Sequence, residues 1–284
     1  MRRAVIIANK WWEADPLVEV LSSASSAPAT IRFARDSEIL GRRGYVEMPR
    51  GRIEIWCIQE LMSPSKSGSN TEEKARVLEP LLSSPDIVFV VAFGTAATPT
   101  DQSLNGSVIV GTKTFCHDPQ AKDTQSHWVP PAPDTIVDSS LDPRLFAALT
   151  ADPLAKEVDA RLLPVPINPD KNPGYAAHYD YVALADVNVT NYADYSWADP
   201  QVVQAFHKLG SPYPIGSLET THAVIRAYAR APFMFASGIT DRVGHFDDEV
   251  TPAAYGQNFV AAHNAALAIA FMIPLLASNV LVSA

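Results

Sequence analysis

The sequence predicts an α/β fold, a three-layer sandwich in which a central mixed β-sheet is flanked by helices. Short runs rich in Val, Ile and Phe alternate with segments that carry helix-start signals, and strand-like runs dominate the first half of the chain. The 284 residues are 47% hydrophobic and 19% charged, which is an ordinary composition for a chain that buries a core. We therefore expect one domain over residues 1–284, with an insertion near 119–142 that is rich in Pro, Asp and Ser.

The expected strands are runs in which β-branched and aromatic residues are concentrated. They are Arg3–Ala8, Ile31–Arg35, Tyr45–Met48, Ile53–Gln59, Ile87–Phe93, Ser107–Phe115, Leu162–Ile167, Tyr181–Val189 and Phe233–Ile239.

The expected helices lie between these strands, and several begin with a recognisable cap. Pro16 occupies a helix-start position, and Asn70 or Thr71 precedes two glutamates that suit the first turn of a helix. The predicted helices are Asp15–Ser22, the segment from Asn70 to Leu82, Asp142–Thr150, Asp199–Leu209, Ser217–Arg230 and the segment from Pro252 to the C-terminus.

The C-terminal segment is apolar enough to raise the question of a membrane anchor. Pro274 interrupts it and Asn279 lies in its last third, whereas a membrane span needs about twenty clean apolar residues. We expect a packed terminal helix and no membrane partner.

Charge and composition exclude several other classes of partner. The formal net charge is −9 and no Lys/Arg run occurs, which argues against nucleic acid. Cys57 and Cys116 lie in or beside apolar runs, as expected of reduced cysteines in a cytoplasmic protein. The histidines His117, His222 and His245 show no metal-ligand spacing, and no Rossmann or Walker motif is present, so neither a metal nor an organic cofactor is expected.

An aspartate follows the most continuous apolar run of the chain. Residues 232–239 are apolar or small throughout, as in a strand that is buried on both faces, and Asp241 comes directly after Thr240. Open α/β sheets bind ligands at the carboxyl ends of such strands. The alternative is that Asp241 caps the next turn and pairs with Arg242.

Four segments together carry a resemblance to a known family. They read IIANKWWEADPLVEVL, SGSNTEEKARVLEPLLSSPDIVFVVAFGTAATP, YVALADVNVTNYADY and GSLETTHAVIRAYARAPFMFASGITD. In this order they resemble the nucleoside phosphorylase and nucleosidase superfamily, whose members cleave the N-glycosidic bond between a base and ribose. The resemblance is closer to the nucleosidase branch, and it implies a phosphorylase/hydrolase-like fold and a homo-oligomer.

The resemblance also implies roles for individual residues. Asp241 would be the acid at a purine base, and Glu13 would activate the attacking water. The other positions would bind the substrate: Glu219 with Leu218 at the ribose, the small-residue loop Gly94, Thr95 and Ala96 beside the sugar, Tyr192 on the base, and Thr240 beside Asp241. Apart from the resemblance, Phe246 follows Asp241 closely in sequence, and we expect it to line the pocket near the 5′ end of the sugar. Simpler alternatives are a solvated turn for Glu13, a helix-start charge for Glu219 and a core position for Tyr192.

One departure from the family favours water over phosphate as the nucleophile. Phosphorylases carry an arginine two residues before the glycine of the small-residue loop, and here that position is Ala92. Lys10, Arg42 or Arg43 could replace it, but nothing in the sequence places them. The sequence thus predicts hydrolysis of a purine nucleoside or a 5′-modified nucleoside. The alternatives are a phosphorylase with a rearranged phosphate site and a non-catalytic nucleoside-binding protein.

Overall fold

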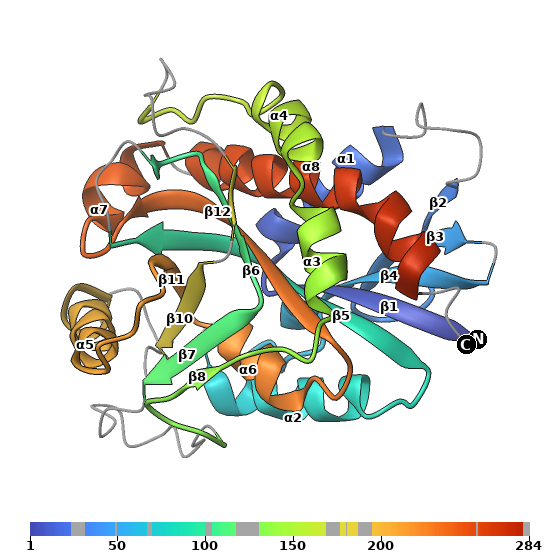
Figure 1. Ribbon diagram of the computed structural model, residues 1–284, viewed down its shortest axis with the longest axis horizontal. Coiled ribbons are helices and arrows are strands. Elements are labelled where there is room, and N and C mark those ends of the chain that lie inside the picture. The colour runs from blue at the N-terminus through green and yellow to red at the C-terminus, as the bar shows by residue number, and fades with distance from the viewer. Residues whose placement is uncertain are drawn as a thin grey trace.

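The computed structural model describes residues 1–23, 32–48, 50–66, 70–99, 104–117, 131–168, 177–179, 181–186, 195–253 and 255–280. The expected base-covering residue Tyr192 and residues 119–130 of the expected insertion lie outside these ranges. Figure 1 shows the described chain as a twisted sheet with helices around it.

The strands form one mixed sheet. Their bounds are β1 Arg2–Ala8, β2 Arg32–Arg35, β3 Arg42–Met48, β4 Gly51–Cys57, β5 Ile87–Thr98, β6 Val108–Gly111, β7 Lys113–His117, β8 Ile136–Val137, β9 Ala177–Tyr179, β10 Val182–Asp186, β11 Ile215–Glu219 and β12 Phe233–Arg242. The order along the sheet is β2-β3-β4-β1-β5-β11-β10-β7-β8, and β12, β6 and β9 branch from β5.

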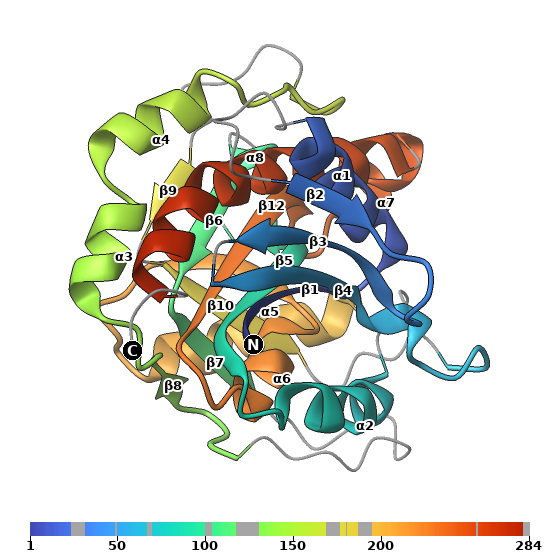
Figure 2. The ribbon, with the colours of Figure 1, turned by 90° about the vertical axis from the view of Figure 1, so that its right-hand side faces the viewer.

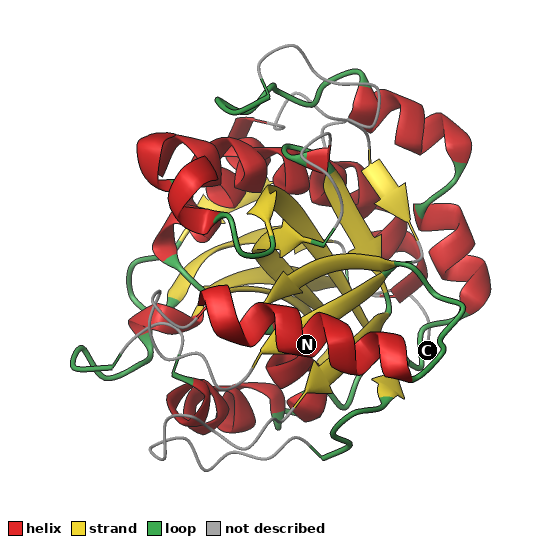
Figure 3. Ribbon diagram, turned by 90° about the vertical axis from the view of Figure 1, so that its left-hand side faces the viewer, coloured by secondary structure: helices red, strands yellow, loops and turns green. Residues whose placement is uncertain are grey.

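Helices cover both faces of this sheet, which confirms the predicted three-layer α/β architecture (Figure 3). Their bounds are α1 Trp11–Ser23, α2 Thr71–Leu82, α3 Pro143–Leu149, α4 Asp152–Asp159, α5 Tyr195–Lys208, α6 His222–Tyr228, α7 Phe246–Glu249 and α8 Tyr255–Val280. In Figure 2, α1, α3, α4 and α8 lie on one side of the sheet, and α2 and α6 lie on the other. Each side buries its own apolar cluster against the sheet.

The central strand β5 has three neighbours, and this branching brings separate parts of the chain to one place. It runs parallel to β1 and to β12, and it meets β11 where Leu218 pairs with Ala97. An irregularity in β12 between Ile239 and Asp241 places Asp241 opposite the same Ala97. The C-terminal ends of β11 and β12 therefore meet β5 at Ala97, and β1 ends beside Phe93, a few residues earlier in β5.

Several predicted elements need correction. The predicted strand at 162–167 is wrong: only an isolated bridge from Val165 to Asn168 forms there. The reason is that the Asn264 side chain occupies both backbone groups of Leu163, and the Gln257 side chain accepts a hydrogen bond from the Ile167 N–H. The single run predicted at 107–115 is two strands, β6 and β7.

Two corrections concern the ends of β5 and β11, which bear on the site. Gly94, Thr95 and Ala96 were expected in a loop, but they continue β5 because they pair with β12. The helix predicted over 217–230 begins only at His222, since Ile215–Glu219 pairs with β10 as a strand.

Other helix boundaries moved by a few residues. The helix expected from Asp15 begins at Trp11, and the one expected from Asp199 begins at Tyr195. Asn70 is the N-cap of α2, as predicted, and its side chain accepts a hydrogen bond from the Glu73 N–H.

The terminal helix α8 packs in the core. Its stretch Gly256–Asn279 has a mean hydropathy of 1.9 and is long and apolar enough, by length and composition, to cross a membrane. Its small and apolar side chains lie against α1 and β12, and the buried ones include Ala261, Ala265, Ile269 and Met272. The packed helix that the sequence predicts is what the structure shows.

The contact between α8 and β12 is so close that it requires a glycine. A Cβ atom on Gly238 would lie 1.9 Å from the backbone oxygen of Ala261. We expect Gly238→Ala to lower the free energy of unfolding by about 3 kcal/mol or more, because the helix backbone has to move to relieve the overlap. Gly256→Ala is the matched control in α8 itself, where a Cβ atom would meet nothing within 4 Å. Urea unfolding of both variants measures the difference, and equal stabilities would contradict this account.

Candidate functional site

A cavity of about 150 Å³ opens where β1, β5, β11 and β12 end. Five carboxylates, one lysine and several apolar and small side chains line it, drawn from segments far apart in the sequence. The lining residues are Asn9, Lys10, Trp12, Glu13, Thr95, Ala96, Ala97, Asp199, Leu218, Glu219, Thr220, Thr240, Asp241, Gly244, Phe246, Asp247 and Asn258.

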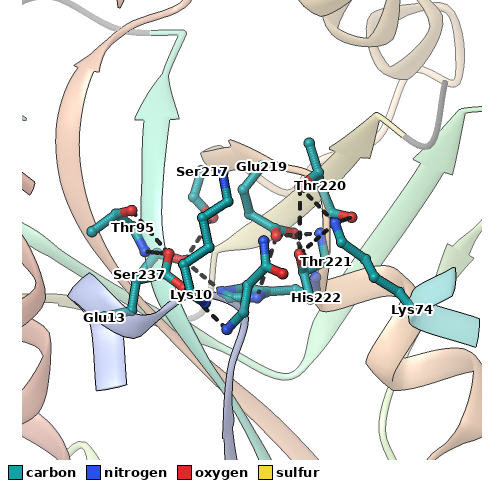
Figure 4. Close-up of polar contacts among 11 residues, drawn as sticks. Lys10, Glu13, Lys74, Thr95, Ser217, Glu219, Thr220, Thr221, His222 and Ser237 are labelled. Atoms are coloured by element: carbon teal, nitrogen blue, oxygen red, sulfur yellow. Dashed lines mark hydrogen bonds and ion pairs between the residues drawn. The ribbon is translucent and has the colours of Figure 1, made fainter. Parts of the chain in front are cut away.

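Glu13 lies in the first turn of α1 and is buried, not solvated. Its Oε2 accepts hydrogen bonds from the backbone N–H groups of Asn9 and Lys10, at 3.0 and 2.9 Å. Its Oε1 accepts from the backbone N–H and the hydroxyl of Thr95, at 2.8 and 2.9 Å. A carboxylate offers about four acceptor positions, so all of them are occupied by protein donors. Glu13 thus joins the turn after β1 to the end of β5 (Figure 4).

Asp241 is 4% exposed at the end of β12. Burial raises the pKa of this carboxyl from 3.8 to about 7, and the negative charge of Glu249 adds to the shift, while a hydrogen bond from the Thr240 hydroxyl at 2.5 Å opposes it. The alternative of an ion pair with Arg242 is wrong, because the Arg242 guanidinium binds Glu249 at 2.6 Å. Asp241 is therefore a buried acid that can hold a proton near neutral pH.

Glu219 ends β11 and faces the same cavity. Its carboxylate accepts hydrogen bonds from the backbone N–H of Thr221 and, at 2.7 Å, from that of His222. These contacts are those of a carboxylate at the start of a helix, as the simpler alternative proposed. The structure combines both features, since the capping carboxylate also lines the cavity.

The cations that could replace a phosphate-binding arginine lie in different places. Arg42 pairs with Asp36 and Glu54, and Arg43 pairs with Asp15 and Glu60, and neither lines the cavity. Lys10 does line it, with its Nζ 4.7 Å from the ring centre of Trp12.

The position of the missing phosphorylase arginine is part of the core. Ala92 is fully buried in β5 within the apolar cluster beneath α2 and α6. Two residues further, a Cβ atom on Gly94 would lie 2.8 Å from Oε1 of Glu13. The absence of a side chain at Gly94 thus leaves room for the Glu13 carboxylate, although Gly94 does not line the cavity.

Most of the predicted site residues come together. The cavity contains Glu13, Thr95, Ala96, Leu218, Glu219, Thr240, Asp241 and Phe246. Within the described ranges, no group of three or more His, Cys, Asp or Glu side chains is placed to hold a metal ion.

Sequence reasoning missed several residues that surround these. Asp199 and Asn258 line the cavity from the helices α5 and α8, and no local motif marks either position. Lys74, which lies outside the cavity, is fully buried in α2 and binds the segment that follows Glu219. The one signal in the sequence was that Lys74 occupies a position on the face of α2 where an apolar residue is expected.

The architecture has counterparts among solved structures. No protein-family model matches the sequence, and no curated protein matches it. The fold matches that of 5′-methylthioadenosine/S-adenosylhomocysteine nucleosidase from Helicobacter pylori with a TM-score of 0.59 and 13% identity, over 96% of this chain and 98% of that one. The enzyme of the same name from Colwellia psychrerythraea 34H, solved in complex with adenine, matches with a TM-score of 0.58 and 17% identity, over 97% of this chain and 96% of that one.

A third match is futalosine hydrolase from Helicobacter pylori, with a TM-score of 0.58 and 12% identity over 96% of this chain and 97% of that one. The chain has the nucleosidase fold. The expected phosphorylase/hydrolase-like architecture is thereby confirmed over nearly the whole length of the sequence.

Proposed function

We propose that this protein is a nucleosidase that hydrolyses the N-glycosidic bond of a purine nucleoside, with a modified 5′ position in its natural substrate. The observation that carries the proposal is Asp241, a buried carboxyl with a pKa raised to about 7 that lines a cavity together with Glu13 and Glu219. The shared fold with nucleosidases supports it.

Asp241 would act as the general acid. A purine is a poor leaving group as an anion, and a proton or a strong hydrogen bond delivered to N7 lets it depart neutral. Because the carboxyl is buried at the end of a strand, it keeps its proton at pH values where an exposed aspartic acid is ionised.

Glu219 and Glu13 would act on the sugar side. A carboxylate can accept hydrogen bonds from two adjacent ribose hydroxyls, which fixes the sugar as it becomes oxocarbenium-like. The attacking water would be held by Glu13. Since the four acceptor positions of Glu13 are occupied, that water would take the position of the Thr95 hydroxyl, the one of the four donors that a side-chain rotation can remove.

Water is the nucleophile that the surroundings favour. Ala92 lies in the core, and both Arg42 and Arg43 are engaged by carboxylates away from the cavity. A phosphate dianion would have to enter a cavity lined by five acidic side chains, Glu13, Asp199, Glu219, Asp241 and Asp247, with Lys10 as the cation among the lining residues.

The 5′ side of the substrate is inferred from the comparisons and from the cavity wall. Matching structures are named as nucleosidases of 5′-methylthioadenosine and S-adenosylhomocysteine, both 5′-modified purine nucleosides. Trp12 and Phe246 supply apolar surface that could contact such a substituent. A cytoplasmic homo-oligomer built from a single domain stays a prediction.

Release of free base from a panel of purine, pyrimidine and 5′-modified purine nucleosides tests the proposal. Each reaction is run in phosphate-free buffer and again with added inorganic phosphate. We expect phosphate-independent release from purine nucleosides, with free ribose or its 5′-modified form as the second product. Release that needs phosphate and yields a sugar 1-phosphate would make the protein a phosphorylase. Stoichiometric binding without turnover would make it a nucleoside-binding protein.

A further inference from the structure

Lys74 is a charged side chain in a place where helix α2 faces the protein interior. It is 0% exposed, and its Nζ donates hydrogen bonds to the backbone oxygen of Thr220 at 2.7 Å, to the Thr220 hydroxyl at 2.8 Å and to the Thr221 hydroxyl at 2.9 Å. An ammonium group has three N–H donors, and these three contacts use all of them. Burying a charged lysine side chain costs free energy, so we expect Lys74 to have a role beyond packing.

The segment that Lys74 binds is the one that Glu219 also binds. The Glu219 carboxylate accepts from the N–H groups of Thr221 and His222, while Lys74 holds the oxygens of Thr220 and Thr221. Figure 4 shows Lys74 and Glu219 meeting at this short turn, with Lys10, Glu13 and Thr95 across from them. A shift of the turn would therefore move the carboxylate relative to the cavity.

The charges around Glu219 come from several elements. From α6, His222 approaches with its Nδ1 3.6 Å from Oε2, but burial lowers the pKa of His222 to about 3, so its ring is neutral. From α2 comes Lys74, whose charge lowers the pKa of Glu219 against the larger, opposite effect of burial. Burial lowers the pKa of Lys74 to about 7, and the charge of Glu219 opposes this shift. Lys10, in the turn after β1, lowers the pKa of Lys74 further, and Glu13, in the first turn of α1, raises it.

We propose that Lys74 is a positioning residue that favours the ionised form of the Glu219 carboxylate and directs it at the cavity. It does so through its charge and through its three hydrogen bonds to the turn at Thr220 and Thr221. A role of this pair in holding the ribose hydroxyls rests on the proposed nucleosidase function, whereas the ionisation of Glu219 by Lys74 does not.

Removing the Lys74 ammonium should raise the pKa of Glu219, because both groups are buried. Without the ammonium, desolvation acts on Glu219 with no nearby positive charge to offset it, so the pKa of Glu219 rises further. A protonated carboxyl has lost acceptor capacity for the sugar. Ribose binding in a Lys74 variant should therefore weaken at neutral pH and recover as the pH is raised.

A carbon-13 NMR titration of the glutamate carboxyl groups tests this directly. Protein labelled at glutamate Cδ is titrated as the wild type, Lys74→Met and Lys74→Gln, and the Glu219 signal is assigned by its loss in Glu219→Gln. We expect the Glu219 midpoint to lie at least about one pH unit higher in both Lys74 variants. Lys156→Met, which removes an exposed lysine of α4, should leave it unchanged. An unchanged Glu219 midpoint in Lys74→Gln would overturn the proposal, whether or not Lys74→Met folds.

Kinetics provide the second measurement. We expect KM for the nucleoside to rise about tenfold or more at pH 7 in Lys74→Gln, with a smaller change in kcat, and the KM difference to shrink toward pH 9. A KM increase that does not depend on pH would overturn the electrostatic part of the proposal. If the wild type releases no base from any nucleoside, the nucleosidase function fails, and the NMR titration still decides the role of Lys74.

Discussion

Asp241→Asn should lower the rate of base release by about a thousand-fold, within the range that a positioned general acid contributes. Asparagine keeps the size and polarity of the side chain but has no proton to give to a departing purine. The measurement is single-turnover base release at saturating substrate. Asp248→Asn is the matched control, because it makes the same change on a carboxyl that is 81% exposed seven residues away. A variant that retains a tenth or more of wild-type activity would rule out Asp241 as the acid.

The wild-type pH profile should report the same group. An acid must be protonated to act, and burial raises the pKa of Asp241 to about 7. We expect kcat to hold at its plateau below pH 7 and to fall as the pH rises through 7, toward tenfold per unit. Activity that rises through this interval would assign the titrating group to a base.

The same shift predicts how Asp241 affects stability. The folded-state pKa lies above the unfolded value, so folding favours the protonated form. The contribution of Asp241 is fully present below about pH 4 and is lost as the pH rises to about 7. Asp241→Asn should therefore gain stability relative to the wild type over this interval, by up to about 4 kcal/mol. Urea unfolding of both proteins at pH 5 and pH 8 measures the difference, and a gap that does not change between the two would contradict the burial of an ionisable group.

Glu13→Gln is expected to lower stability and activity together. Each carboxylate oxygen of Glu13 accepts two hydrogen bonds, so an amide in its place would turn an –NH₂ group toward two donors. Losing two hydrogen bonds to a charged group should lower the free energy of unfolding by about 3 kcal/mol or more. Glu19→Gln, on the same helix but exposed, is the matched control.

Activity decides between the two roles of Glu13. If Glu13 also activates water, base release should fall by about a hundred-fold or more, even at a temperature where the variant is fully folded by circular dichroism. A variant that is less stable yet nearly as active would leave Glu13 as a structural link between β1 and β5 only.

Much of the fold followed from local patterns. The Val- and Ile-rich runs of β1, β4, β5 and β12 are strands, and the Asn70 cap opens α2. These features depend on neighbouring residues, so a single sequence carries them. The failures share a different cause. Residues 162–167 read as a strand because they are apolar, yet Asn264, about a hundred residues away in sequence, takes up the backbone groups that a strand would use.

The site residues also fall into two groups, those that the sequence indicated and those whose roles depend on distant contacts. Asp241 could be predicted because an acidic residue at the end of a buried strand is conspicuous, and the resemblance supplied Glu13 and Glu219. A helix-start role for Glu219 was one of the two alternatives. Its combination with a place in the cavity wall could not be predicted, because it depended on where the preceding strand ended. The role of Lys74 could not be predicted either, because its hydrogen-bond partners lie 146 and 147 residues away in sequence.

The dependence of the site on β5 has a consequence for how the protein is made. Glu13 reaches Thr95 across 82 residues, and the Thr240 hydroxyl reaches Ala96 across 144. During synthesis one edge of β5 stays unpaired until β12 has left the ribosome. Helix α8 emerges later still. Such non-local pairing slows folding and exposes an apolar strand edge meanwhile. A nascent chain halted near residue 230 should therefore bind chaperones and lack any nucleoside affinity, and both should change only when the final strand and helix are released.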